Sequence, residues 1–74
     1  MWGREVSAIT ERRGQAARAA ALLRSAADRV EATAPDEGPE DEAARYRGAA
    51  VLAHTAGLEL AFVAGTVAAQ EVES

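Results

Sequence analysis

The chain has 74 residues and a formal net charge of −4, and it contains neither cysteine nor lysine. This length allows one domain at most, covering 1–74, and so small a core often needs oligomerisation or a metal for stability. Without cysteine there are no disulfides or thiolate metal sites, and without lysine there is no Gly-x-x-x-x-Gly-Lys phosphate loop. Hydrophobic residues make up 49% of the chain but aromatic ones only 4%, and alanine supplies much of the total. Such a composition favours helices that pack by close approach.

The first predicted helix covers about 5–34. Its apolar residues follow a 3-4 spacing that only Arg13 interrupts: Val6, Ile9, Ala16, Ala20, Leu23, Ala27 and Val30. This heptad-like seam predicts packing against another helix. Gly14 marks either a fraying point or a close helix crossing. The amino-terminal residues contain no apolar signal core, so we expect a cytoplasmic protein.

The clearest break in the pattern is the predicted loop at 35–38. Pro35 disfavours helical geometry at the preceding residue, and Pro39 suits the first turn of a new helix. Three acidic residues, Glu40 to Glu42, then follow at the positive end of that helix. The second predicted helix covers about 39–72. Because the loop is short, the sequence predicts an all-α, two-helix antiparallel hairpin.

The second predicted helix is apolar on two faces. Val51, Leu58, Phe62, Ala69 and Val72 share one face, and Leu52, Ala56, Leu60, Val63 and Val67 share the other. Only a narrow row of Thr55, Glu59, Thr66 and Gln70 is expected to face water. A helix that is apolar on most of its circumference must be covered on most of it, which one partner helix cannot do. We therefore expect the hairpin to form a four-helix-type bundle by homo-oligomerisation, or to dock on a larger helical protein.

A row of small residues also runs along this helix at intervals of four: Ala49, Ala53, Gly57, Ala61, Gly65 and Ala69. Small side chains allow a neighbouring backbone to approach closely, so the row predicts a tight helix–helix interface. The predicted interface combines this row with the large apolar residues. It comprises Val51, Leu52, Leu58, Leu60, Phe62, Val63, Gly65, Val67, Ala69 and Val72.

No group of residues predicts catalysis, a cofactor or a metal. His54 is the only histidine, and it lacks neighbouring ligands in the sequence, although a site across a symmetric dimer is one alternative. Glu59 is expected on the solvent-facing row, with pairing to an arginine of the first helix or a catalytic role as alternatives. Serine, histidine and acidic residues are not grouped as a triad would require. We predict a non-enzymatic protein with no cofactor.

Two other kinds of partner are disfavoured by charge. The arginines of the first helix, including Arg12 and Arg13, spread around it among acidic residues, and this is a poor footprint for nucleic acid. The apolar span 48–69 is long enough to cross a bilayer. However, His54 and Glu59 would then lie deep in lipid, and a central carboxylate costs about 2.5–3.5 kcal/mol. The sequence therefore argues against both nucleic acid and membrane as partners.

Two segments, Leu22 to Pro35 and Leu52 to Glu73, resemble the helices of small actinobacterial type VII (ESX, WXG-like) secretion substrates. Their closest local match is His54-Thr55-Ala56-Gly57-Leu58-Glu59-Leu60-Ala61. The resemblance implies a helical hairpin that pairs into a four-helix bundle and is secreted without a cleavable signal. The chain departs from the family in lacking its Trp-x-Gly turn between the helices and its export signal after the second helix.

Function therefore remains a choice between alternatives. We expect a small helical interaction, assembly or accessory protein that acts through an oligomeric helix–helix interface. One alternative is a type VII secretion substrate or its chaperone-like partner. The other is a small regulatory protein that is antitoxin-like or associated with DNA.

Overall fold

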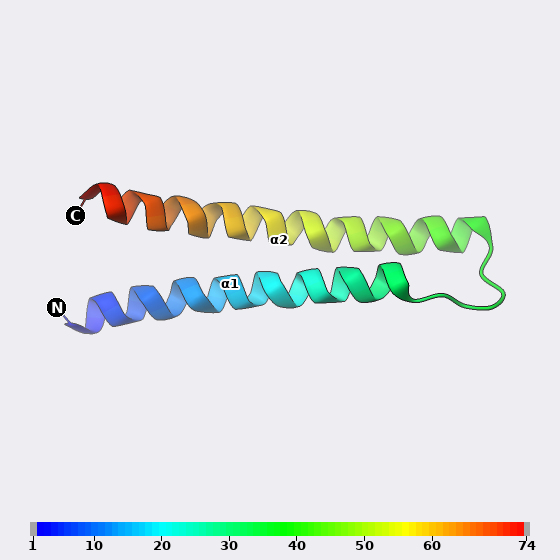
Figure 1. Cartoon of the computed structure of the whole chain (residues 1–74), viewed down its shortest axis with the longest axis horizontal. Helices are drawn as coiled ribbons and strands as arrows, with labels where there is room; N and C mark the ends of the chain where they lie inside the picture. Colours follow the sequence, from blue (N-terminus) through cyan, green and yellow to red (C-terminus); the bar gives the residue numbers. More distant parts are fainter. Residues whose placement is uncertain (1, 74) are drawn as a thin grey trace.

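The protein is an antiparallel pair of long helices, as a computed structural model of the chain shows (Figure 1). The structure describes the backbone of residues 2–73 and the side chains of residues 8–70. Helix α1 spans Trp2–Glu31 and helix α2 spans Pro39–Glu73, with no strand in the described part. The pair measures 58 × 19 × 11 Å, so it is a long slab one helix thick. This confirms the prediction of an all-α helical hairpin.

The connection between the helices is longer than the sequence indicates, because α1 ends at Glu31 and not near residue 34. The guanidinium of Arg45 explains this earlier end. Its Nη1 donates to the carbonyl oxygens of Arg29 and Val30 at 2.6 and 2.5 Å. Those carbonyls would accept from residues 33 and 34 if the helix continued. The α2 side chain therefore replaces the next turn of α1.

The two helices meet along one row of residues from each, which we call the contact seam. In α1 the seam follows heptad spacing through Ala8, Arg12, Gln15, Ala19, Leu22 and Ala26. In α2 it follows the same spacing through Arg45, Ala49, Leu52, Ala56, Glu59, Val63 and Thr66. All of these side chains are buried or half-buried. At the free ends, Arg12 extends the seam by donating to the amide oxygen of Gln70.

The fully buried part of the seam consists of alanines alone: Ala19, Ala26, Ala49 and Ala56. Alanine lets the helix backbones approach closely, but each one removes little apolar area from water. The hairpin therefore brings two helices together without enclosing a core of large side chains. Most of the stabilisation expected from apolar burial must come from elsewhere.

Two predictions about helix orientation are wrong. The predicted α1 seam, which includes Ile9, Leu23 and Val30, lies beside the contact seam and not in it. Glu59 and Thr66, expected in water, instead face α1 and are half-buried. Both helices are apolar over more than one face, so the pattern alone does not fix which face meets the partner helix.

The other two residues of the row that was expected to face water, Thr55 and Gln70, are both exposed. Thr55 is exposed, as expected, and its hydroxyl donates to the carbonyl of Val51 at 3.0 Å. Gln70 is exposed but bonded to Arg12 of the opposite helix.

Gly14 neither ends α1 nor marks a close crossing within the hairpin, because a Cβ built there would meet nothing within 4 Å.

Candidate functional site

The large hydrophobic side chains of this hairpin lie mostly on its surface. Among the side chains that the structure describes, nine large hydrophobic ones are exposed. They form two groups on different sides of the molecule: Ile9, Leu23, Val30, Tyr46, Leu60 and Val67 in one, and Val51, Leu58 and Phe62 in the other. Contiguous exposed apolar surface is uncommon on soluble monomers and marks interaction sites. These two groups are therefore the candidate functional surfaces.

Apart from Val30, the first group lies one residue after the contact seam in both helices. Because the helices run in opposite directions, these positions fall on the same side of the hairpin. Extending this rule to every seam position, and adding Val30 one heptad after Leu23, defines what we call the apolar strip. Its α1 residues are Ile9, Arg13, Ala16, Ala20, Leu23, Ala27 and Val30, and its α2 residues are Tyr46, Ala50, Ala53, Gly57, Leu60, Ala64 and Val67.

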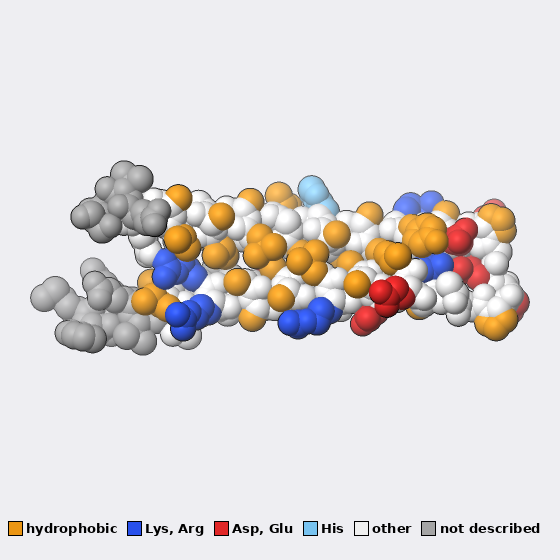
Figure 2. Space-filling view, in the orientation of Figure 1, with side chains coloured by type: hydrophobic (Ala, Val, Ile, Leu, Met, Phe, Trp, Pro, Cys, Tyr) orange, Lys and Arg blue, Asp and Glu red, His pale blue; other side chains and the backbone are white. Residues whose placement is uncertain are grey.

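Arg13 is the only charged residue of the apolar strip. The large side chains of the strip are 37–50% exposed. Figure 2 shows hydrophobic side chains gathered over both helices and along the line where they meet. The strip therefore forms one continuous surface that belongs to the hairpin and not to either helix alone.

The second group, which we call the outer face, belongs to α2 alone. Val51, Leu58 and Phe62 are 65%, 61% and 66% exposed, and thus more open than any large residue of the strip. Across the seam, the adjoining positions of α1, one residue before it, are Glu11, Gly14, Arg18, Ala21 and Ser25. The outer face is therefore narrower than the strip, and no large apolar side chain continues it on α1.

The ten predicted interface residues fall into four sets. Leu52 and Val63 lie in the contact seam, and Leu60 and Val67 lie on the apolar strip. Val51, Leu58 and Phe62 form the outer face, next to the exposed Gly65 and Ala69. The side chain of Val72 is outside the described residues. The sequence identified the α1 half of the strip as a packing row but did not include it in the predicted interface, and it missed Tyr46.

The row of small residues is not the contact between α1 and α2. Residues four apart turn by about 40° more than a full circle, so the row winds around the helix. Ala49 is buried in the seam, whereas Gly57 and Gly65 are exposed and would have open space around an added Cβ. Within the hairpin, no neighbouring atom is close enough to require glycine at either position.

A polar clamp closes the loop end of the hairpin. Arg45 pairs with Glu37, with Nε 2.8 Å from Oε1 and Nη2 3.0 Å from Oε2, in addition to its bonds to the α1 carbonyls. Its guanidinium also lies 4.8 Å from the centroid of the Tyr46 ring. The hydrogen bond from Arg45 holds the pKa of Glu37 below its usual value. The carboxylate partner of Arg45 thus comes from the loop and not from the acidic first turn of α2.

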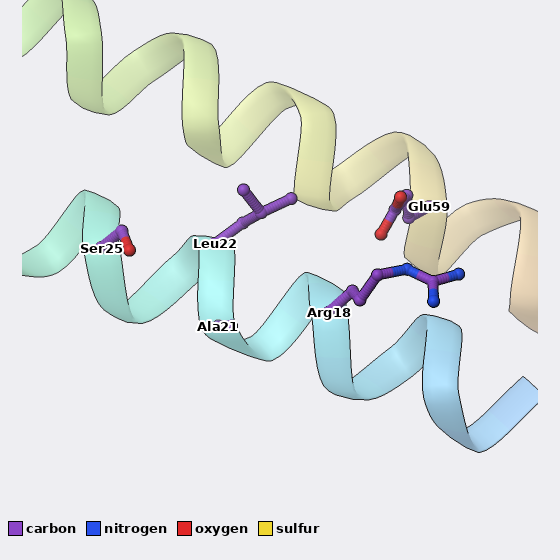
Figure 3. A pocket seen from close by; sticks show the side chains of 5 residues that line it. All are labelled: Arg18, Ala21, Leu22, Ser25 and Glu59. Carbon is purple, nitrogen blue, oxygen red and sulfur yellow. The ribbon is translucent and has the colours of Figure 1, made fainter.

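Glu59 lines a shallow groove between the helices with Arg18, Ala21, Leu22 and Ser25. One of its carboxylate oxygens, Oε2, is buried and has no hydrogen-bond partner. Figure 3 shows the Arg18 side chain reaching toward Glu59 from the opposite helix. The described side chains form no ion pair in this groove, so the hydrogen-bonding capacity of the Glu59 carboxylate is only partly satisfied.

His54 is exposed on α2, and the described residues contain no group of three histidine or acidic side chains placed to hold a metal ion. Within residues 39–70, helix α2 also contains an 18-residue window with a mean hydropathy of 1.5, which is long and apolar enough to cross a membrane. Length and composition are the only basis for that result, and the segment includes Arg45, Arg47 and Glu59.

Comparisons with protein-family models, with curated proteins and with solved structures found no match for this chain. The surfaces of the hairpin are therefore the basis for assigning a function.

Proposed function

We propose that this chain is a small, non-enzymatic assembly protein that acts by binding other helices through its exposed apolar surfaces. The observation that supports the proposal is the distribution of side-chain size. The contact seam buries only alanines fully, while nine large hydrophobic side chains between residues 8 and 70 stay exposed.

The exposed area supports the same conclusion. A compact monomer of 7.7 kDa is expected to expose roughly 4,300 Å². The hairpin exposes 5835 Å², which is about 1,500 Å² more than this size relation gives. A standard protein interface buries about 800 Å² on each partner. The excess is thus large enough for at least one such interface.

The shape of the molecule indicates what kind of partner fits. Long, flat apolar surfaces along two antiparallel helices match the faces of other helices, which pack with axes 8–10 Å apart. The proposed partner is thus a helical surface, either a further copy of the chain or a different protein. A ligand pocket is a weaker interpretation, since the groove at Glu59 is shallow and open.

Mass in solution over a concentration series tests this function. We expect a species heavier than 7.7 kDa that keeps its helical circular dichroism on dilution until it dissociates. A stably helical monomer at every concentration, which also fails to bind added helical partners, would contradict the proposal. Binding to lipid vesicles without self-association would favour a membrane function instead.

A further inference from the structure

We infer that a second copy of this chain docks on the apolar strip, with the two hairpins in opposite orientations, to form a four-helix bundle. This inference rests on the proposed function and specifies its partner, its surface and its geometry. Three features of the hairpin support it: the continuity of the strip, the area available and the distribution of charge.

The strip has the pattern that a four-helix bundle requires. In such a bundle each helix contacts two neighbours, so its apolar face widens from the two seam positions of a heptad to three. In this hairpin the apolar faces of both helices widen on the same side. Ile9, Leu23 and Val30 of α1 lie on the side that carries Leu60 and Val67 of α2.

A partner with a single helix would cover only half of this surface. A second hairpin presents two antiparallel helices at the same spacing, and its own strip is equally in need of cover. Pairing two identical strips removes both from water in one symmetric interface. The excess area of about 1,500 Å² per chain exceeds the roughly 800 Å² that one partner contributes to a standard interface.

Charge selects between two symmetric orientations. Residues 31–42, at the loop end, contain six acidic residues and no basic one: Glu31, Asp36, Glu37, Glu40, Asp41 and Glu42. Stacking two hairpins with loop on loop would bring these twelve carboxylates to one end of the bundle. The opposite orientation separates them by almost the full 58 Å length of the hairpin.

The opposite orientation also gives Arg13 an acidic environment. Arg13 lies near the free end of the strip, where Arg12 is its neighbour. Each free end then lies beside the acidic loop end of the second copy, and opposite charges within a few ångströms attract. Figure 2 shows the acidic side chains of this face in the half nearer the loop. In this arrangement each helix lies antiparallel to its own copy.

Matched substitutions test the surface. Leu60→Glu places a charge on the strip, and Leu58→Glu places the same charge two residues away on the outer face. Sedimentation equilibrium should show a dimer for the wild type, an increase in Kd of about thirtyfold or more for Leu60→Glu, and little change for Leu58→Glu. Leu23→Glu, on the α1 half of the strip, should act like Leu60→Glu. Circular dichroism above the Kd identifies a variant that fails to fold.

Single cysteines test the orientation, because the chain has no native cysteine. Ala20 lies near the middle of the α1 strip and should meet its own copy at the two-fold axis, so Ala20→Cys should form a disulfide-linked dimer on mild oxidation. Ala27→Cys, one heptad nearer the loop, should not. In the loop-on-loop arrangement each α1 helix would lie against α2 of the second copy, so absence of the Ala20→Cys disulfide would overturn the opposite orientation. Cross-linking of Ala27→Cys in place of Ala20→Cys would overturn the proposed position of the two-fold axis.

The outcomes separate this inference from the proposed function. If Leu58→Glu dissociates the dimer and Leu60→Glu does not, self-assembly stands and the strip is the wrong surface. If the wild type is a helical monomer that binds another helical protein, the proposed function stands and the second copy is the wrong occupant. If the wild type binds no helical partner of either kind, both proposals fail.

Discussion

The contact seam and the apolar strip are adjacent rows on the same two helices, yet they differ in what they hold. The seam contains small or polar residues at most positions, and its fully buried members are alanines. The strip contains six large hydrophobic side chains that remain partly exposed. The seam therefore sets how closely the helices approach, whereas the strip holds the side chains whose burial would stabilise an assembly. In a hairpin this thin, folding and association are expected to be coupled.

Added volume in the contact seam should have the largest effect on stability. Ala56 is fully buried in the seam, and Ala61 is exposed outside both the seam and the strip. Ala56→Leu should push the helices apart and destabilise the hairpin by about 1–3 kcal/mol. Ala61→Leu is the control for side-chain chemistry and should cost much less. Thermal unfolding followed by circular dichroism measures both, and equal effects would show that Ala56 does not lie at a tight contact.

Removing the partly satisfied acid of the seam should have the next largest effect. Glu59→Met replaces the carboxylate, whose Oε2 is buried without a partner, by an apolar group of similar length. A buried unsatisfied polar group costs about 1–3 kcal/mol, so unfolding should become less favourable by roughly 1 kcal/mol or more. Urea titration measures the change.

A loss of stability in Glu59→Met would show that Glu59 makes a favourable interaction, most directly with Arg18 across the groove. Arg18→Gln provides the control. It should leave stability almost unchanged if no ion pair forms, and it should reproduce the loss if one does.

Substitution of Gly14 should give a smaller increase in stability. An added Cβ would meet nothing within 4 Å, and glycine in a helix interior is about 1 kcal/mol less favourable than alanine. Gly14→Ala should therefore raise the melting temperature without changing the mass in solution. Destabilisation would indicate that another helix crosses closely at Gly14, on the side of the hairpin away from the strip.

The clamp at the loop end should give the smallest effect, visible only in acid. Because Arg45 lowers the pKa of Glu37 in the folded protein, the pair stabilises the hairpin above the unfolded-state pKa of about 4.3. This contribution is lost as the pH falls through the lower, folded-state pKa. Glu37→Gln should remove that part of the acid dependence of the melting temperature. An unchanged pH profile would show that the pair does not contribute in solution.

The sequence predicted the two helices and their antiparallel pairing because proline, glycine and the acidic first turn mark the break between them. It did not predict which faces meet. The predicted α1 seam has the heptad spacing of a packed row, but Arg45, Glu59 and Thr66 show that α2 turns a mixed row toward α1. Apolar periodicity identifies every face that water disfavours, and it does not rank them when there are several.

The end of α1 could not be predicted for a different reason. Arg45 accounts for it by bonding the carbonyls of Arg29 and Val30, which are distant in sequence. A capping interaction of this kind depends on the tertiary pairing of the helices. Conversely, the apolar strip could have been found once the seam was known, since it follows from a shift of one residue in both helices.

The most direct test of this account is the mass of the wild type and of the Leu60→Glu and Leu58→Glu variants, measured side by side by light scattering across a concentration series. We predict a dimer of about twice 7.7 kDa for the wild type and Leu58→Glu, and dissociation toward monomer for Leu60→Glu. A wild-type monomer, or a dimer that only Leu58→Glu disrupts, would contradict the assignment of the apolar strip as the surface of self-assembly.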